Sequence, residues 1–312
     1  MRVRSALSAL AAGVGGLSGI NAVLNRRVDQ IDPALSGDHD SMTWNEIEVS
    51  YTEAGDPTDH TLVLLHGINA AGSSGEFRKI FTELSDSYHV VAPDLPGFGT
   101  SDRPSLRYSA AFYEEFIQAF LTEDRFESVS VIASSLTGAY LASVADDMTT
   151  DIESMVFICP TERGGPNRIV ALRELLRAPV IGTALFNLLT SKPSIRYFNA
   201  DHGYYNIENI SETWMEYEWQ TAHQPNARYA PASFISGFLN KSEELETTLS
   251  DIDVPVTLLW GREADITPLQ RGRKLAKNAG CRLVVVDDAK LLPHVEFPDQ
   301  CIKTIQSAVN RR

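Results

Sequence analysis

The sequence is poor in cysteine and in motifs that bind cofactors. Its 312 residues contain only Cys159, Cys281 and Cys301, which are too few and too scattered for a disulfide framework or a metal site. No glycine-rich phosphate loop, haem attachment motif or metal-ligand spacing occurs in it. We therefore predict that the protein uses neither a cofactor nor a metal.

Basic residues are also scarce. Lys and Arg number 27 against 41 Asp and Glu, which gives a formal net charge of −14, and few of the basic residues are lysines. Because such a surface repels phosphates, we expect no nucleic-acid partner. The acidic excess further predicts a surface adapted to high salt.

An uncharged run lies near the N-terminus. Residues 5–25 carry no charge and are flanked by arginines at positions 2, 4, 26 and 27. The run is long enough to span a bilayer, but glycines and serines dilute it, so an export signal or a helix packed on the globular body also fits. We assign residues 1–42 to this segment and a linker. We expect a cytoplasmic protein, with weak membrane attachment through residues 5–25 as the alternative.

Strand and helix patterns alternate through most of the remaining chain. This alternation predicts an α/β fold, with a mostly parallel central sheet and helices on both of its faces. We assign residues 43–160 and 251–312 to this core. Residues 161–250 break the pattern, because they are helical in period and rich in aromatic residues. We expect them to form a helical cap, or lid, over the strand ends where ligands bind.

The stretch from Ser128 to Ala142 reads as a buried strand that turns sharply into a helix. A serine at such a turn is typical of a nucleophile elbow, in which the hydroxyl is lifted above the sheet. Ser135 fits this turn better than Ser134, because Ala133 and Thr137 are smaller than the neighbours Ser134 would have. Taken alone, such a serine could equally be a helix N-cap.

Three further fragments share this strand-end context. They are Leu-Leu-His-Gly-Ile-Asn at 64–69, Leu-Trp-Gly-Arg-Glu-Ala-Asp at 259–265 and Leu-Leu-Pro-His-Val-Glu-Phe-Pro at 291–298. With the elbow, and in this order, they make the chain resemble the α/β-hydrolase family from about residue 43 to the C-terminus. The segment Asp-Leu-Pro-Gly-Phe-Gly-Thr-Ser-Asp at 94–102 is also typical of that family.

The resemblance implies a catalytic triad in the chain order Ser, acid, His. Ser135 would be the nucleophile, His294 the general base, and Asp265 the carboxylate that orients the imidazole. Two plainer interpretations stay open: Asp265 as a helix-capping carboxylate and His294 as a packing residue. Other candidate acids are Glu263, Asp287 and Asp288.

The resemblance also implies an oxyanion hole made of backbone N–H groups, donated by Ile68 and Leu136. A serine at the elbow excludes relatives that use aspartate there. We therefore expect a serine hydrolase acting on a small or medium apolar carboxylic ester, with a small-molecule substrate as its partner. Carbon–carbon bond hydrolysis, lactone hydrolysis and cofactor-free peroxidase-type chemistry on the same triad are alternatives. A non-catalytic ligand-binding protein is another, favoured by the β-branched Thr137 at a tight turn.

Overall fold

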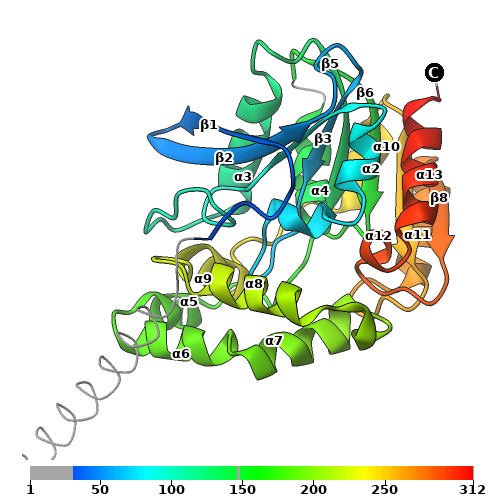
Figure 1. Cartoon of the computed structure of the whole chain (residues 1–312). Coiled ribbons are helices and arrows are strands. Elements are labelled where there is room, and N and C mark those ends of the chain that lie inside the picture. The colour runs from blue at the N-terminus through cyan, green and yellow to red at the C-terminus, as the bar shows by residue number, and fades with distance from the viewer. Residues whose placement is uncertain (1–30, 146–147, 312) are drawn as a thin grey trace, which may run out of the picture.

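One sheet of eight strands forms the centre of the molecule, in the order β1-β2-β4-β3-β5-β6-β7-β8 (Figure 1). The computed structural model describes residues 31–145 and 148–311 of the chain. β1 and β2 form an antiparallel hairpin, β2 joins β4 antiparallel, and every other pairing is parallel. The strands are β1 (Asp38–Trp44), β2 (Ile47–Ala54), β3 (Thr61–Leu65), β4 (His89–Pro93), β5 (Ser128–Ser134), β6 (Asp151–Ile158), β7 (Val256–Gly261) and β8 (Arg282–Val286).

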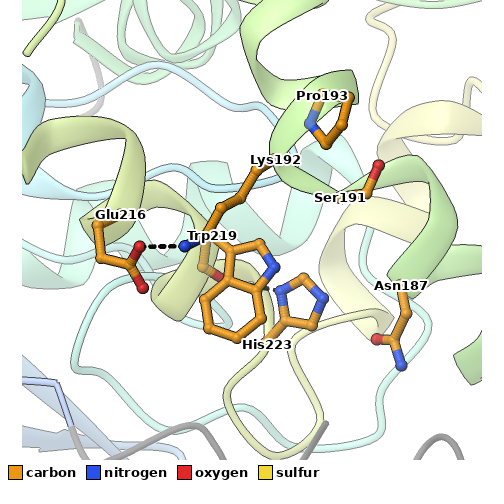
Figure 2. Close-up of a pocket in the computed structure, with 7 residues that line it drawn as sticks. All are labelled: Asn187, Ser191, Lys192, Pro193, Glu216, Trp219 and His223. Atoms are coloured by element: carbon orange, nitrogen blue, oxygen red, sulfur yellow. Dashed lines mark hydrogen bonds and ion pairs between the residues drawn. The ribbon is translucent and has the colours of Figure 1, made fainter. Parts of the chain in front are cut away.

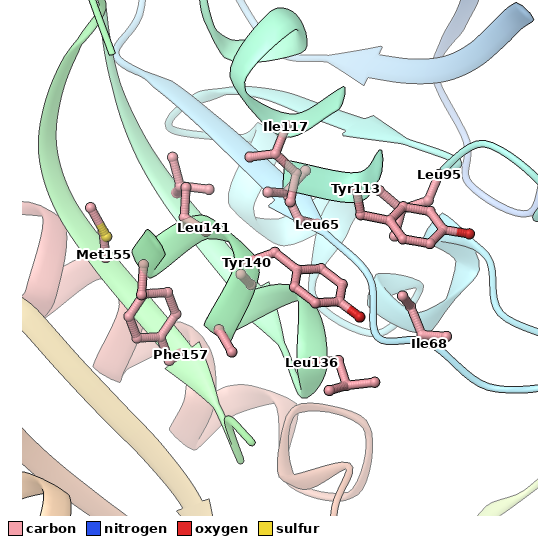
Figure 3. Packing of buried hydrophobic residues seen from close by; sticks show 14 of the residues in the cluster. Leu65, Ile68, Leu95, Tyr113, Ile117, Leu136, Tyr140, Leu141, Met155 and Phe157 are labelled. Carbon is pink, nitrogen blue, oxygen red and sulfur yellow. The ribbon is translucent and has the colours of Figure 1, made fainter. Parts of the chain in front are cut away.

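Helices cover both faces of this sheet. They are α2 (Phe81–Ser85), α3 (Ala110–Leu121), α4 (Leu136–Val144), α10 (Leu245–Asp251), α11 (Leu269–Ala279), α12 (Pro293–Glu296) and α13 (Pro298–Val309). The side chains of β5 alternate between two cores: Val131 packs with α3 and α4 on one face, and Ile132 packs with α2 and α13 on the other. In the first core the rings of Tyr113 and Tyr140 stack with centroids 5.9 Å apart (Figure 3). The predicted α/β fold with a mostly parallel sheet is confirmed.

The stretch between β3 and β4 is only partly helical. Apolar residues recur at helical spacing over residues 76–86, but the chain there forms a 3₁₀ turn, η1 (Ser74–Phe77), and the short helix α2. Glu76 turns inward from η1, where its carboxylate accepts the backbone N–H of Gly67 at 2.8 Å. A surface helix would point this polar side chain toward water, so the buried contact accounts for the break.

The segment between β6 and α10 is helical. It contains α5 (Val170–Arg177), α6 (Ile181–Leu189), α7 (Lys192–Phe198), the π-helical turn η3 (Asn199–Gly203), the 3₁₀ turn η4 (Ile207–Asn209), α8 (Glu212–Ala222) and α9 (Tyr229–Ile235). These elements form a layer beside the end of the sheet near which α12 lies (Figure 1). We call this layer, residues 164–241, the cap. The next helix, α10, packs against α4 and α11 of the core instead.

A single asparagine joins the two chain segments that connect the cap to the core. The side-chain oxygen of Asn240 accepts the backbone N–H groups of Gly164 and Gly165 at 3.1 and 3.2 Å. Its amide nitrogen donates to the carbonyls of Gly165 and Pro166 at 3.2 and 2.7 Å. All four contacts bind the outgoing segment to the returning one, and we call this arrangement the Asn240 clasp.

No helix within residues 31–145 and 148–311 is both long and apolar enough to cross a membrane. The uncharged run at residues 5–25, on which the prediction of membrane attachment depends, lies outside the described residues.

Candidate active site

Ser135 is the single residue between the end of β5 and the start of α4. Its backbone has φ 55° and ψ −127°, a strained conformation that side-chain-bearing residues adopt rarely. Neighbouring segments hold it there: its N–H donates to Ile158 at 2.9 Å, and its carbonyl accepts from Thr161 at 3.3 Å. Ser134, by contrast, is the last residue of the strand and is buried. Ser135 therefore occupies the turn at which the sequence pattern placed it.

The loop after β3 passes very close to this turn. A Cβ atom added at Gly67 would lie 3.2 Å from Ser134 Oγ and 3.4 Å from Ser135 Cβ, so a larger side chain would crowd the site. The hydroxyl of Thr137, in the first turn of α4, donates to the carbonyl of His66 at 2.7 Å. Thr137 thus connects the elbow to this loop. Its place in the sequence suggested only steric strain, because the carbonyl that it binds lies 71 residues earlier.

Two backbone N–H groups at this junction are available to a ligand. Leu136 begins α4, so its N–H has no partner within the helix. Ile68 follows Gly67 in the adjacent loop. In residues 31–145 and 148–311, neither N–H donates to a protein acceptor. These are the two residues expected to form the oxyanion hole.

His66 supports the loop and has no free ring nitrogen. Its Nε2 accepts the N–H of Leu95 at 3.0 Å, which leaves Nδ1 to donate to the carbonyl of Gly67 at 2.8 Å. Burial lowers the pKa of His66, so the ring stays neutral in this arrangement.

His294 lies in α12 and is fully buried. Its ring lies 5.6 Å from that of Phe77, and its Nε2 is 3.4 Å from Glu76 Oε1, an ion pair when the imidazole is protonated. Neither ring nitrogen has a hydrogen-bond partner among the residues that the structure describes. The imidazole therefore has unused donor and acceptor capacity beside a carboxylate.

Glu76 connects His294 to the elbow. The second oxygen of Glu76, Oε2, accepts the N–H of Gly67. A Cβ atom added at Gly67 would lie 3.2 Å from this oxygen and 3.2 Å from Ser134 Oγ, so both side chains border the same glycine. Burial alone would raise the pKa of Glu76. The contacts with His294, the Ser134 hydroxyl and the Gly67 N–H outweigh that effect and hold the pKa below its usual range. The group is thus an ionised carboxylate in a buried site.

Glu76 could not be recognised from the sequence, because 218 residues separate it from His294 and its surroundings resemble the start of an ordinary helix. The one hint in the sequence is that Glu76 is a charged residue beside the apolar Phe77, nine residues after Gly67 of the His-Gly motif.

Asp265 lies elsewhere. Its side chain, in the loop after β7, is 70% exposed, and one carboxylate oxygen is 3.8 Å from the Lys290 ammonium group. No hydrogen bond or ion pair joins Asp265 to His294 in the described part of the chain. The other candidate acids, Glu263, Asp287 and Asp288, are also exposed. The structure therefore brings Glu76, rather than any acid expected from the sequence, to His294.

A pocket of about 520 Å³ lies within the cap (Figure 2). Trp219 of α8 and His223, the residue after this helix, stack on one side of it, with Lys192 of α7 paired to Glu216 nearby. None of the residues around the elbow lines this pocket. No group of three or more His, Cys, Asp or Glu residues in 31–145 and 148–311 has an arrangement that could hold a metal ion.

The chain is similar to known proteins over most of its length. Residues 62–304 match the sequence model of the alpha/beta hydrolase family. The 2-hydroxy-6-oxo-6-(2'-aminophenyl)hexa-2,4-dienoic acid hydrolase of Metapseudomonas resinovorans is 23% identical over 287 residues, which cover 85% of this chain and 89% of that protein.

Two solved structures share the fold at low sequence identity. The 2-hydroxy-6-oxo-6-phenylhexa-2,4-dienoate hydrolase from Rhodococcus sp. strain RHA1 superposes with a TM-score of 0.71 at 21% identity, covering 88% of this chain and 99% of that one. An esterase from Rhodococcus sp. ECU1013 gives a TM-score of 0.66 at 17% identity, covering 87% and 98%.

Proposed function

Because the chain belongs to the alpha/beta hydrolase family, we propose that it is a serine hydrolase that cleaves a carboxylic ester, with Ser135 as the nucleophile. Membership of this enzyme family confirms the resemblance found in the sequence and makes the protein an α/β-hydrolase. The observation that carries the proposal is the strained backbone of Ser135, held between β5 and α4 beside two unpaired N–H groups. Strained backbone conformations concentrate at active sites, and this one lies where a nucleophile elbow is expected.

In the proposed reaction the Ser135 hydroxyl attacks the carbonyl carbon of the ester, and His294 accepts its proton. The carbonyl oxygen becomes an oxyanion that accepts hydrogen bonds from the N–H groups of Leu136 and Ile68. The alcohol then departs with the proton from His294, leaving an acyl group on Ser135. A water molecule then attacks the acyl carbonyl and gives its proton to His294, and the acid is released as Ser135 regains its proton.

We assign the carboxylate of this relay to Glu76. A positive charge that forms on His294 is stabilised by an anion 3.4 Å away, and Glu76 is held in its ionised form. Asp265, the acid expected from the sequence, is solvent-exposed and faces Lys290, so we expect it to contribute less. It remains a prediction that the variants below test.

Labelling with a fluorophosphonate probe tests the nucleophile. Ser135→Ala should abolish labelling and turnover, whereas Ser134→Ala should retain labelling because its hydroxyl faces Glu76 below the turn. Labelling that persists in the Ser135 variant would overturn the assignment. A chain that is folded but never labelled would favour a non-catalytic ligand-binding protein.

The pH profile tests the relay. In Glu76→Gln the amide oxygen can still accept the Gly67 N–H, but the negative charge beside His294 is lost. We expect kcat/KM to fall by at least tenfold and the remaining activity to rise at a lower pH than in the parent enzyme, with Asp265→Asn as the matched control. A larger loss in Asp265→Asn than in Glu76→Gln would restore Asp265 as the acid.

Carbon–carbon bond hydrolysis is the second candidate, favoured by the names of the two dienoate hydrolases that match most of the chain. Both reactions use the same nucleophile and oxyanion hole. Assaying short-chain nitrophenyl esters beside a 2-hydroxy-6-oxo-dienoate separates them, and a kcat/KM that is higher for the dienoate would replace the ester proposal.

A further inference from the structure

Large apolar side chains are exposed mainly on one part of the molecule. Eight of the eleven that the described residues expose fall within α5, α6, α7 and their immediate flanks. We call these eight the apolar cap face: Ile169, Val170, Leu175, Ile181, Leu188, Leu189, Tyr197 and Phe198. Single exposed apolar residues are common on soluble proteins, but a group on consecutive helices indicates an interaction surface.

The packing of the cap does not require these residues. α5, α6 and α7 each bury a different apolar side chain toward the rest of the protein: Leu176, Phe186 and Ile195. The three helices lie on the outer side of the cap, with α8 and α9 between them and the sheet (Figure 1). The helices are thus apolar on their packed side and again on their outer side.

The charge of this region is opposite to that of the whole chain. Residues 163–198 contain six basic residues and one acidic residue, Glu174, a net charge of 6 − 1 = +5, whereas the full chain carries −14. Four of the six pair with Glu174, Glu212 or Glu216. Arg168, next to Ile169, is exposed and lies over the ring of Phe238 at 5.9 Å, with no carboxylate partner among the described residues. An apolar face on a segment of net positive charge suits the interface of a bilayer with anionic lipids.

The first described residues, from Ile31 onward, lie on the side of the core that faces the cap. A Cβ added at Gly75 would lie 2.5 Å from Ala34 Cβ and 2.7 Å from a ring atom of Trp214 in α8, so residues near 34 pass between η1 and the cap. The 21 uncharged residues 5–25 are long enough to span a bilayer core of about 30 Å as a helix. Only residues 26–30 separate that run from Ile31, a reach of roughly 20 Å at most.

From these observations we infer that the apolar cap face rests on the surface of an anionic lipid bilayer to which residues 5–25 anchor the chain. This inference goes beyond the proposed function and does not depend on it. The short connection holds the cap side of the molecule near any membrane that the run enters, and the surface held there is both apolar and free of acidic excess.

A fluorescent label on the cap face of the full-length protein tests the inference. Leu188→Cys in α6 carries an environment-sensitive dye, in a Cys281→Ala background because Cys159 and Cys301 are buried. Lys303→Cys in α13, exposed and distant from α6 in Figure 1, is the matched control, and Tyr197→Cys is a second label site. Each protein is reconstituted into phosphatidylcholine–phosphatidylglycerol vesicles with and without brominated acyl chains.

We expect brominated lipid to quench the dye at position 188, and at 197, several-fold more strongly than at 303. Equal quenching at all sites would overturn the inference. So would a dye at 188 whose emission responds to protein density rather than to bromination, which indicates a second copy on the face. A blue-shifted dye that responds to neither would show that residues 5–25 fold back on the face, and it would also overturn the inference.

Discussion

The backbone of Ser135 is the most informative feature at the scale of single residues. A residue with a side chain is strained at φ 55° and ψ −127°, whereas glycine adopts positive φ readily. We therefore expect Ser135→Gly to be more stable than Ser135→Ala, with a free energy of unfolding that is higher by on the order of 1 kcal/mol. Its melting temperature should be higher accordingly. Thermal melts of the two inactive variants measure the difference.

The neighbouring serine provides the control for that comparison. Ser134 lies in β5 with ordinary strand geometry, so Ser134→Gly should be less stable than Ser134→Ala. The same order of stabilities at both positions would show that Ser135 carries no stored strain.

Single residues also mark the limit of what the sequence predicts about the site. The local pattern predicts the turn at Ser135, because a strand-to-helix turn depends on the size of adjacent residues. No local pattern predicts Glu76, because a carboxylate becomes a partner of His294 only when η1 and α12 are brought together. Asp265 follows a strand as expected of a catalytic acid, yet its side chain points into solvent. Position at a strand end limits the location of a side chain but does not determine its direction.

At the scale of secondary-structure elements, the start of α4 depends on Thr137. Its buried hydroxyl is the one side-chain hydrogen bond that connects α4 to the loop after β3, among the contacts of the described residues. Thr137→Val keeps the shape but leaves the His66 carbonyl unpaired, so we expect a loss of about 1–3 kcal/mol in stability. Fluorophosphonate labelling should also slow, because the N–H groups of Ile68 and Leu136 lose their common support. Thr137→Ser, which keeps the hydroxyl, should behave almost as the parent; identical effects of Val and Ser would remove the hydrogen bond from the explanation.

Helix α8 carries a second testable group. Glu218 accepts the amide of Asn199 at 2.7 Å, and burial raises its pKa to about 7 from an ordinary value of 4.5. Between these two values the folded state binds more protons than the unfolded state, so this group lowers stability as pH rises through that window. Glu218→Gln removes this titrating group. The melting temperature of the variant minus that of the parent should therefore be larger at about pH 8 than at about pH 5.

Glu216→Gln is the matched control on the same helix, since its carboxylate lies at the surface beside Lys192. A pH-independent difference between the parent and Glu218→Gln would contradict the assigned titration.

Elements of the core were easier to predict than those of the cap. β3 and β7 are largely apolar because both faces of a parallel sheet are covered, and such runs are visible in the sequence. The cap helices are apolar on the outside as well as on the packed side, so their pattern does not reveal which face is buried. Their existence could be predicted, but their orientation could not.

At the scale of the whole molecule, charge predicts a response to salt. With a formal net charge of −14, acidic side chains repel one another across the surface, and added cations screen that repulsion. We expect the melting temperature to climb as potassium chloride rises from low to molar concentration. Melting in the same series with an uncharged osmolyte separates screening from preferential exclusion, and a flat or falling response to the chloride would remove the idea of salt adaptation.

The Asn240 clasp has a consequence for how this scaffold can change over generations. Its four hydrogen bonds fix the point where the chain leaves the core after β6 and the point where it returns before α10. The cap also contacts the core elsewhere: Glu296 accepts the N–H groups of Tyr205 and Asn206. Insertions and deletions between Gly165 and Asn240 therefore leave the two connections in place only where they spare the stretches that touch the core.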